Sequence, residues 1–273
     1  KRVGMDLRTR LYLAVVFLML AGLVFSKFLL SSSQIALFCL IVLEKGGIKR
    51  IIRAFTNPLV IVLISVYLMH VFGLLWSEDF AYGVLDLKKK LPLLIMPVLL
   101  AAIPPFDKKE SSLILKAFVS FIVLMSLINI IRYFTLPHDD SYRIALWHSH
   151  IRFSLLVCLS LSMIIWLFVK KEFVRYEKVL AVFSLLFLSF FLLLLQSFTG
   201  MVVFALMVPF LVVLYKKSIR NNIIKAGIGL LIALIAGYSI WAFLTVKNGF
   251  FPKTDPLDFT EVEFFTENGG DYM

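Results

Sequence analysis

Long apolar runs recur along the whole chain and are the feature that most limits how it can fold. Nine runs can be drawn, at residues 11–25, 28–43, 58–76, 91–103, 113–133, 151–169, 179–196, 200–215 and 226–246. Most approach the ~20 residues that a helix needs to cross the hydrocarbon core of a bilayer. Because lipid offers no hydrogen bonds to the backbone, runs of this length predict helices rather than open strands.

The composition supports the same class of protein. Hydrophobic residues make up 61% of the 273 residues and charged residues only 16%, whereas a soluble domain is about half apolar and a quarter charged. We therefore expect an all-α, polytopic integral membrane bundle of about nine transmembrane helices over residues 1–246. Residues 247–273 are expected to begin an outside domain. The second and fourth runs are short, and we expect each to be tilted, broken or partly re-entrant.

Lysine and arginine gather on alternate connections between the predicted helices. These connections hold 18 of the 28 basic residues, namely Lys1, Arg2, Arg8, Arg10, Lys45, Lys49, Arg50, Arg53, Lys108, Lys109, Lys170, Lys171, Arg175, Lys178, Lys216, Lys217, Arg220 and Lys225. Basic connections resist translocation and stay in the cytoplasm. The pattern predicts a cytoplasmic N-terminus, an outside C-terminus and an odd number of crossings.

The net charge of +11 is spread over many connections. This spread favours orientation in the membrane and contact with anionic lipid over nucleic-acid binding. Cys39 and Cys158 both lie in apolar runs, so we interpret them as small packed residues rather than a disulfide or a metal pair.

Arg152 begins the sixth predicted helix on its outer side, with Arg143, His148 and His150 close by in the sequence. Arginine presents planar donors that suit a diphosphate or a carboxylate, so these residues are candidates for binding such a group. The alternative is that Arg152 reaches out to lipid headgroups while neighbouring aromatic residues lie in the interfacial belt.

A metal site is a second interpretation of the same segment. His148 and His150 follow His138, Asp139 and Asp140, and imidazole and carboxylate are usual zinc ligands. Two histidines at i and i+2 share a face only on a strand, however, and this segment adjoins a helix. We therefore expect interfacial polar residues and no metal.

Three consecutive lysines, Lys88, Lys89 and Lys90, lie on an outside connection, against the charge rule. Such a cluster would attract an anionic headgroup or a lipid-linked phosphate. A solvated charge run, or a fourth helix that begins earlier than residue 91, would also explain it. A further outside feature is the hairpin from Ser197 to Gly200, where polar helix caps give a local explanation.

The order of these outside segments resembles the O-antigen ligase and polymerase superfamily, particularly its Bacteroidetes-type members. The resemblance covers nearly the whole chain. It lies in four segments, which are residues 76–79 (Trp-Ser-Glu-Asp), 86–94 (Asp-Leu-Lys-Lys-Lys-Leu-Pro-Leu-Leu), 150–154 (His-Ile-Arg-Phe-Ser) and 197–200 (Ser-Phe-Thr-Gly).

The resemblance implies an inverting, metal-independent glycosyltransferase without cofactors at the periplasmic face of the bacterial inner membrane. Such enzymes transfer a glycan from undecaprenyl diphosphate to lipid A core or to a growing polysaccharide. Arg152 matches an arginine that holds the diphosphate leaving group, and Ser197 and Gly200 match a Ser-Arg-x-Gly hairpin. Phe198 stands where the family commonly has arginine, so the hairpin lacks that phosphate ligand.

The family's catalytic base is a histidine of a large periplasmic loop, and no histidine follows His150. We therefore expect the chain to be a fragment whose base lies beyond residue 273. Two alternatives from other classes stay open. One is a transporter or flippase for an anionic lipid-linked substrate, and the other is a membrane scaffold without catalysis.

Overall fold

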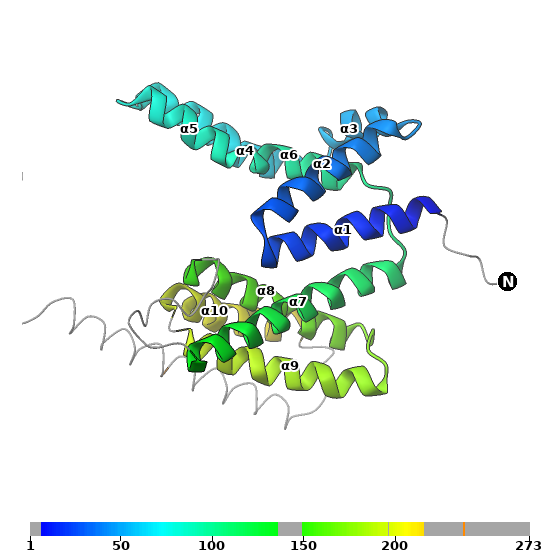
Figure 1. Ribbon diagram of the computed structural model, residues 1–273, viewed down its shortest axis with the longest axis vertical. Helices are drawn as coiled ribbons and strands as arrows, with labels where there is room; N and C mark the ends of the chain where they lie inside the picture. The colour runs from blue at the N-terminus through cyan, green and yellow to red at the C-terminus, as the bar shows by residue number, and fades with distance from the viewer. Residues whose placement is uncertain (1–6, 136–148, 196, 216–236, 238–273) are drawn as a thin grey trace, which may run out of the picture. The chain divides into compact units, whose positions relative to one another are not determined.

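The computed structural model describes residues 7–135, 149–195, 197–215 and 237, and the regular secondary structure of these residues is helical throughout (Figure 1). The chain forms two compact units, Lys1–Leu195 and Gln196–Met273. The helices of the first unit are α1 (Leu7–Phe25), α2 (Lys27–Leu43), α3 (Gly47–Ala54), α4 (Pro58–Gly73), the 3₁₀ turn η1 (Leu74–Trp76), α5 (Phe80–Lys90), α6 (Pro92–Ala102), α7 (Lys108–Thr135), α8 (His150–Val169) and α9 (Arg175–Leu194). The second unit contains α10 (Phe198–Tyr215).

The all-helical prediction is confirmed for the described residues, and eight of the nine predicted runs coincide with helices. Among the described residues, five helical segments are long and apolar enough to cross a membrane, namely α1, α4 with η1, α7, α8 and α9. The bent pair α2 and α3 makes a sixth if the two helices together form one span. The ninth predicted run, 226–246, lies outside the described residues except for Gly237.

The first two helices form a tight hairpin. Ser26 alone separates them, and its side chain caps α2 by accepting a hydrogen bond from the Leu29 backbone N–H. Gly22 lies where a Cβ atom would come within 2.4 Å of the Leu30 backbone nitrogen. A glycine is therefore required for α1 and α2 to approach this closely.

A sharp bend follows α2, beyond the end of the second predicted run, which is itself a continuous helix. The axes of α2 and α3 differ by 115°. Gly46 adopts a left-handed backbone with φ of 84°, and Gly47 lies against the Ile41 carbonyl, where a Cβ atom would come within 1.6 Å. The bend depends on these two glycines, since L-residues rarely adopt this conformation and no side chain fits beside Ile41.

A polar network holds three helix ends together at this bend. Glu44 accepts hydrogen bonds from the Tyr12 hydroxyl at 2.6 Å and from Arg50 Nη2 at 2.5 Å. It also forms an ion pair with Arg8. Arg50 Nε donates to the Ala102 carbonyl at the end of α6, at 2.8 Å. The start of α1, the α2–α3 bend and the end of α6 therefore share one end of the first unit.

The α5 and α6 helices form one kinked element, which we call the α5–α6 arm (residues 80–102). Leu91 between them keeps helical backbone angles, and the helix breaks there because Pro92 has no N–H to continue the ladder. Val98 of α6 packs with Val60 near the start of α4. Since α5 begins directly after η1, the arm runs back along α4.

Helices α7, α8 and α9 pack into a second group. Lys116 near the start of α7 forms an ion pair with Glu177 in the first turn of α9, at 2.7 Å. Phe153 at the start of α8 packs edge-on against Phe191 near the end of α9, with ring centroids 5.7 Å apart. Hence α8 runs antiparallel to α7 and α9.

These contacts bring predicted cytoplasmic connections together in pairs. Arg8 and Arg50 meet at Glu44, and Lys116, inside α7, meets Glu177 in the first turn of α9. The side of the membrane on which these connections lie stays a prediction.

We predict that Glu44→Gln lowers stability at neutral pH. Burial alone would raise the pKa of the Glu44 carboxyl, but the hydrogen bonds from Tyr12 and Arg50 and the charges of Arg50 and Arg8 hold that pKa below its usual range. The carboxylate therefore stabilises the fold above the unfolded pKa, and this contribution is lost as pH falls through the lower, folded pKa. Removing one partner of such a network costs about 1 to 3 kcal/mol.

Thermal unfolding in detergent measures this effect. The gap in midpoint between wild type and Glu44→Gln should be largest at pH 7 and should close below about pH 4. Glu78→Gln, at an exposed carboxyl of the α4–α5 turn, is the matched control and should change little. A gap that is equal at both pH values would contradict this role of Glu44.

Candidate functional site

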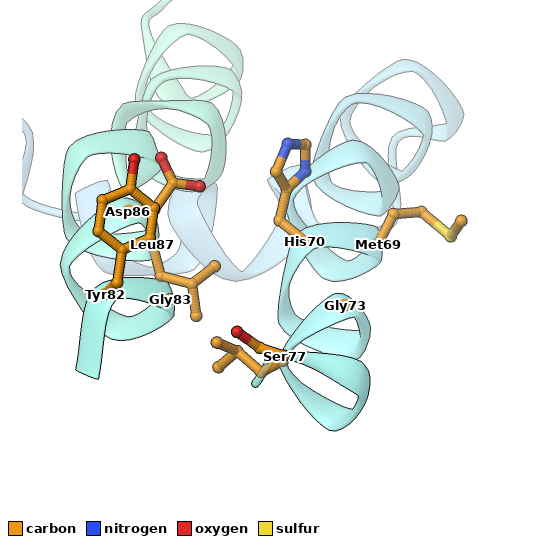
Figure 2. Close-up of a pocket in the computed structure, with 9 residues that line it drawn as sticks. Met69, His70, Gly73, Ser77, Tyr82, Gly83, Asp86 and Leu87 are labelled. Carbon is orange, nitrogen blue, oxygen red and sulfur yellow. The ribbon is translucent and has the colours of Figure 1, made fainter. Parts of the chain in front are cut away.

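The α4–α5 turn borders a cavity of about 410 Å³ that is open to the surface of the first unit (Figure 2). Helix α6 packs closely on α4, whereas α5 leaves this space beside it. The cavity is lined by Met69, His70, Gly73, Leu74, Ser77, Tyr82, Gly83, Asp86 and Leu87. Its volume lies within the ~300–1,000 Å³ typical of small-molecule sites.

Polar groups from facing helices meet across this cavity. Figure 2 shows the His70 imidazole on α4 facing the Tyr82 hydroxyl and the Asp86 carboxylate on α5. His70 Nδ1 donates to the Val66 carbonyl at 2.8 Å, because a carbonyl can only accept. The Ser77 hydroxyl donates to the Asp79 carbonyl at 3.0 Å.

Glycine makes the cavity possible on both walls. A Cβ atom added to Gly73 would meet nothing within 4 Å, so its missing side chain leaves open space on the α4 wall. Gly83 on the α5 wall lies against Leu74, where a Cβ atom would come within 2.4 Å of the leucine side chain. Gly83 thus lets α5 approach Leu74 of η1, and Gly73 leaves the space between the two helices open.

The three lysines lie in the last turn of α5 rather than on a loop. This arrangement matches the expectation that the fourth helix begins before residue 91. Lys90 Nζ forms an ion pair with Asp86 at 2.6 Å, one turn away. Lys88 and Lys89 are exposed and have no carboxylate partner within the residues that the structure describes. Cations in this turn also interact favourably with the carboxyl end of the helix.

The α5–α6 arm carries these lysines near its middle. At 1.5 Å per residue, the arm from Asp79 to Ala102 spans about 35 Å, and Lys89 lies about 15 Å along it. The hydrocarbon core of a bilayer is about 30 Å thick. If α4 crosses the membrane, the arm beside it carries three lysines and Asp86 into the bilayer region, where charged side chains are costly and usually mark a functional site.

A second set of cations lies at one end of the α7–α9 group. Arg152 is exposed in the first turn of α8, two residues after His150. Arg132 lies in the last turn of α7. Since α7 and α8 are antiparallel, Arg132 and Arg152 share the same end of this group. Neither has an ion-pair partner in the described ranges.

The hairpin before α10 belongs to the second unit and has the local structure expected from its polar residues. The buried Ser197 side chain accepts a hydrogen bond from the Gly200 backbone N–H at 3.3 Å. This bond satisfies one of the free donors at the start of α10. The capping interpretation is therefore confirmed.

Two of the predicted site residues, Arg143 and His148, lie outside the described residues. Of the others, the structure pairs Lys90 with Asp86 beside Lys89, and it places His150 and Arg152 together on α8. In residues 7–135, 149–195 and 197–215 no three His, Cys, Asp or Glu residues group as metal ligands. The residues of the predicted metal site that precede residue 149, namely His138, Asp139, Asp140 and His148, fall outside these ranges.

Sequence reasoning missed His70, Tyr82 and Arg132. The spacing of His70 and Asp86 gives no hint of their proximity, because it depends on the arm folding back along α4. Arg132 is the next-to-last residue of the predicted run 113–133, where a snorkelling side chain is the usual interpretation.

Comparison with protein-family models, with curated proteins and with solved structures gave no match to this chain.

Proposed function

We propose that this chain is a membrane glycosyltransferase of the O-antigen ligase or polymerase type. It binds a glycan linked to undecaprenyl diphosphate, which is transferred to lipid A core or to a growing polysaccharide at the periplasmic face of the bacterial inner membrane. The observation that carries this proposal is the lysine row of the α5–α6 arm, beside a polar cavity.

A lipid-linked diphosphate fits the charge of this row. Only Lys90 has a carboxylate partner among the described residues, so Lys88 and Lys89 leave two positive charges on an arm that runs along a candidate span. Unpaired lysines in the bilayer region are stabilised by an anion that can enter the outer leaflet. The diphosphate of a lipid-linked donor can enter the leaflet because its lipid tail anchors it there, whereas a soluble anion stays in water.

The arginines at the end of the α7–α9 group supply donors of a second kind. Arg152 and Arg132 present planar guanidinium groups that bind phosphate oxygens in bidentate fashion. In the proposed enzyme they stabilise the charge that develops on the diphosphate as the sugar leaves. Arg143 remains a predicted third member, with His148 and His150 as supporting polar residues.

The proposal is also supported by the order of the four outside segments along the chain, which resembles that of the O-antigen ligase and polymerase superfamily. The proposal includes nine crossings, a cytoplasmic N-terminus and a periplasmic C-terminus. In this topology the α4–α5 turn and the start of α8 both face the periplasm, so that Lys88, Lys89 and Arg152 act from the same side.

The second candidate is a transporter or flippase for an anionic lipid-linked substrate. One observation favours it, namely that Asp86 and the lysines lie along the arm rather than at its end, and transporters place charged groups near the bilayer midplane. Movement of a fluorescent undecaprenyl diphosphate lipid across proteoliposomes containing the chain would support this candidate, and a glycosyltransferase should give none.

We predict that the chain in nanodiscs binds undecaprenyl diphosphate. Two variants, Arg152→Gln and the double variant Lys88→Gln with Lys89→Gln, should each weaken this binding about tenfold, because each removes charged donors to phosphate. Arg175→Gln, at the exposed start of α9 and on a predicted cytoplasmic connection, is the matched control and should bind as wild type does. Native mass spectrometry measures the affinities. Equal binding by all four proteins would contradict the proposed role of these cations.

We also predict that a reporter fused after Thr254 reports the periplasm. The excess of Lys and Arg on alternate connections places residues 247–273 outside the cytoplasm. Paired fusions to alkaline phosphatase and to green fluorescent protein measure this, and only the phosphatase should be active. A fluorescent, phosphatase-negative fusion would reverse the topology and remove the site from the periplasm.

A further inference from the structure

The cavity between α4 and α5 offers more hydrogen-bond acceptors than donors. In the Nδ1–H tautomer, His70 donates to the Val66 carbonyl and keeps Nε2 as an acceptor. Ser77 uses its proton on the Asp79 carbonyl, which leaves its oxygen lone pairs. A ligand that fills this cavity must therefore supply several donors.

The remaining polar groups of the cavity, Asp86 and Tyr82, add another acceptor and one hydroxyl. One Asp86 oxygen accepts from Lys90, and the other has no hydrogen-bond partner within the described part of the chain. The Tyr82 hydroxyl is likewise without a partner among the described residues and is the one donor that can turn toward a ligand. Three acceptors and one hydroxyl suit a ligand that carries many hydroxyl groups.

The charges around the cavity disfavour a cationic ligand. The Asp86 carboxylate on its wall is paired with Lys90, so the wall itself carries no free negative charge. Lys88 and Lys89, exposed on the following turn of α5, repel a cation. A neutral molecule is favoured inside the cavity, with any anionic group outside it beside the lysines.

The apolar lining adds a second requirement. Met69, Leu74 and Leu87 line the same space as the polar groups, and the Tyr82 ring is 64% exposed. An aromatic face and aliphatic walls bind apolar surface, while the polar edge fixes orientation. A sugar ring has both parts, because its C–H face is apolar and its edge carries hydroxyls.

We infer that the α4–α5 cavity binds one sugar ring of the lipid-linked glycan. His70, Ser77 and Asp86 accept hydrogen bonds from its hydroxyls, and Tyr82 donates one and packs beside the ring. The inference rests on the proposed function, since the diphosphate attached to that sugar then lies against Lys88 and Lys89. The cavity is thus a recognition site for the glycan, separate from the cations that hold its carrier.

The experiment compares two lipids on the whole chain in phosphatidylcholine nanodiscs. Undecaprenyl diphosphate and the same lipid carrying one N-acetylglucosamine are titrated separately and followed by native mass spectrometry. We expect the sugar-bearing lipid to bind about tenfold more tightly. Gly73→Leu fills the cavity without removing a polar group, so it should abolish this preference and leave the affinity for the bare lipid unchanged.

Two further variants keep the test decisive if Gly73→Leu folds poorly. Tyr82→Phe removes a single hydroxyl and should reduce the preference about threefold to tenfold. Ser65→Leu adds similar bulk at an exposed position of α4 outside the cavity and should keep the preference. Equal binding of both lipids by wild type, or a preference that survives in both Gly73→Leu and Tyr82→Phe, would overturn the sugar site while the proposed carrier binding stands. Failure of wild type to bind either lipid would overturn the proposed function.

Discussion

The hydrogen bond from Arg50 to the Ala102 carbonyl fixes the geometry on which the rest of the first unit depends. Arg50 lies on α3, just past the glycine bend, and also binds Glu44. It therefore ties the end of α6 to the end of α2. Since α4 starts next to this anchor and ends at η1, the chain after η1 can return to Ala102 only by running back along α4. A basic residue that sequence rules assign to membrane orientation thus also determines the course of the α5–α6 arm.

This course explains why charge and cavity occur together. The arm must cover the length of α4 with about 23 residues, and its first half is polar while its second half is apolar and packs on α3 and α4. The polar half leaves a space beside α4 that is lined by His70, Tyr82 and Asp86. The lysines next to that space hold the diphosphate of a lipid-linked donor in the account proposed above. The binding site is thus a product of the hairpin, and neither α4 nor α5 alone contains it.

Much of the fold could be predicted from hydrophobic runs, because helix formation in lipid follows from length and composition. The predicted run 58–76 coincides with α4 and η1, whereas the bend beyond the second run depends on Gly46 and Gly47. The short helix α3 was not predicted, and α5 was anticipated only as an earlier start of the fourth helix, because their apolar residues are too few for a hydropathy signal. The facing of His70 and Asp86 could not be predicted either, since it depends on a tertiary return path. Arg152 could be selected by its place at a helix start, whereas Arg132, inside a long run, could not.

The depth of Lys89 in the bilayer tests this account most directly. The two native cysteines are first replaced, by Cys39→Ser and Cys158→Ala, so that a nitroxide attaches only where it is intended. The nitroxide is then placed at Lys89→Cys in one protein and at Asp79→Cys in another. The depth of each label in nanodiscs is measured by power-saturation electron paramagnetic resonance. An arm that returns along α4 places residue 89 about 15 Å from residue 79 along the membrane normal, toward the bilayer centre. A label at 89 that is as shallow as the label at 79 would show that α5 lies on the surface, and would contradict both the arm and the carrier site built on it.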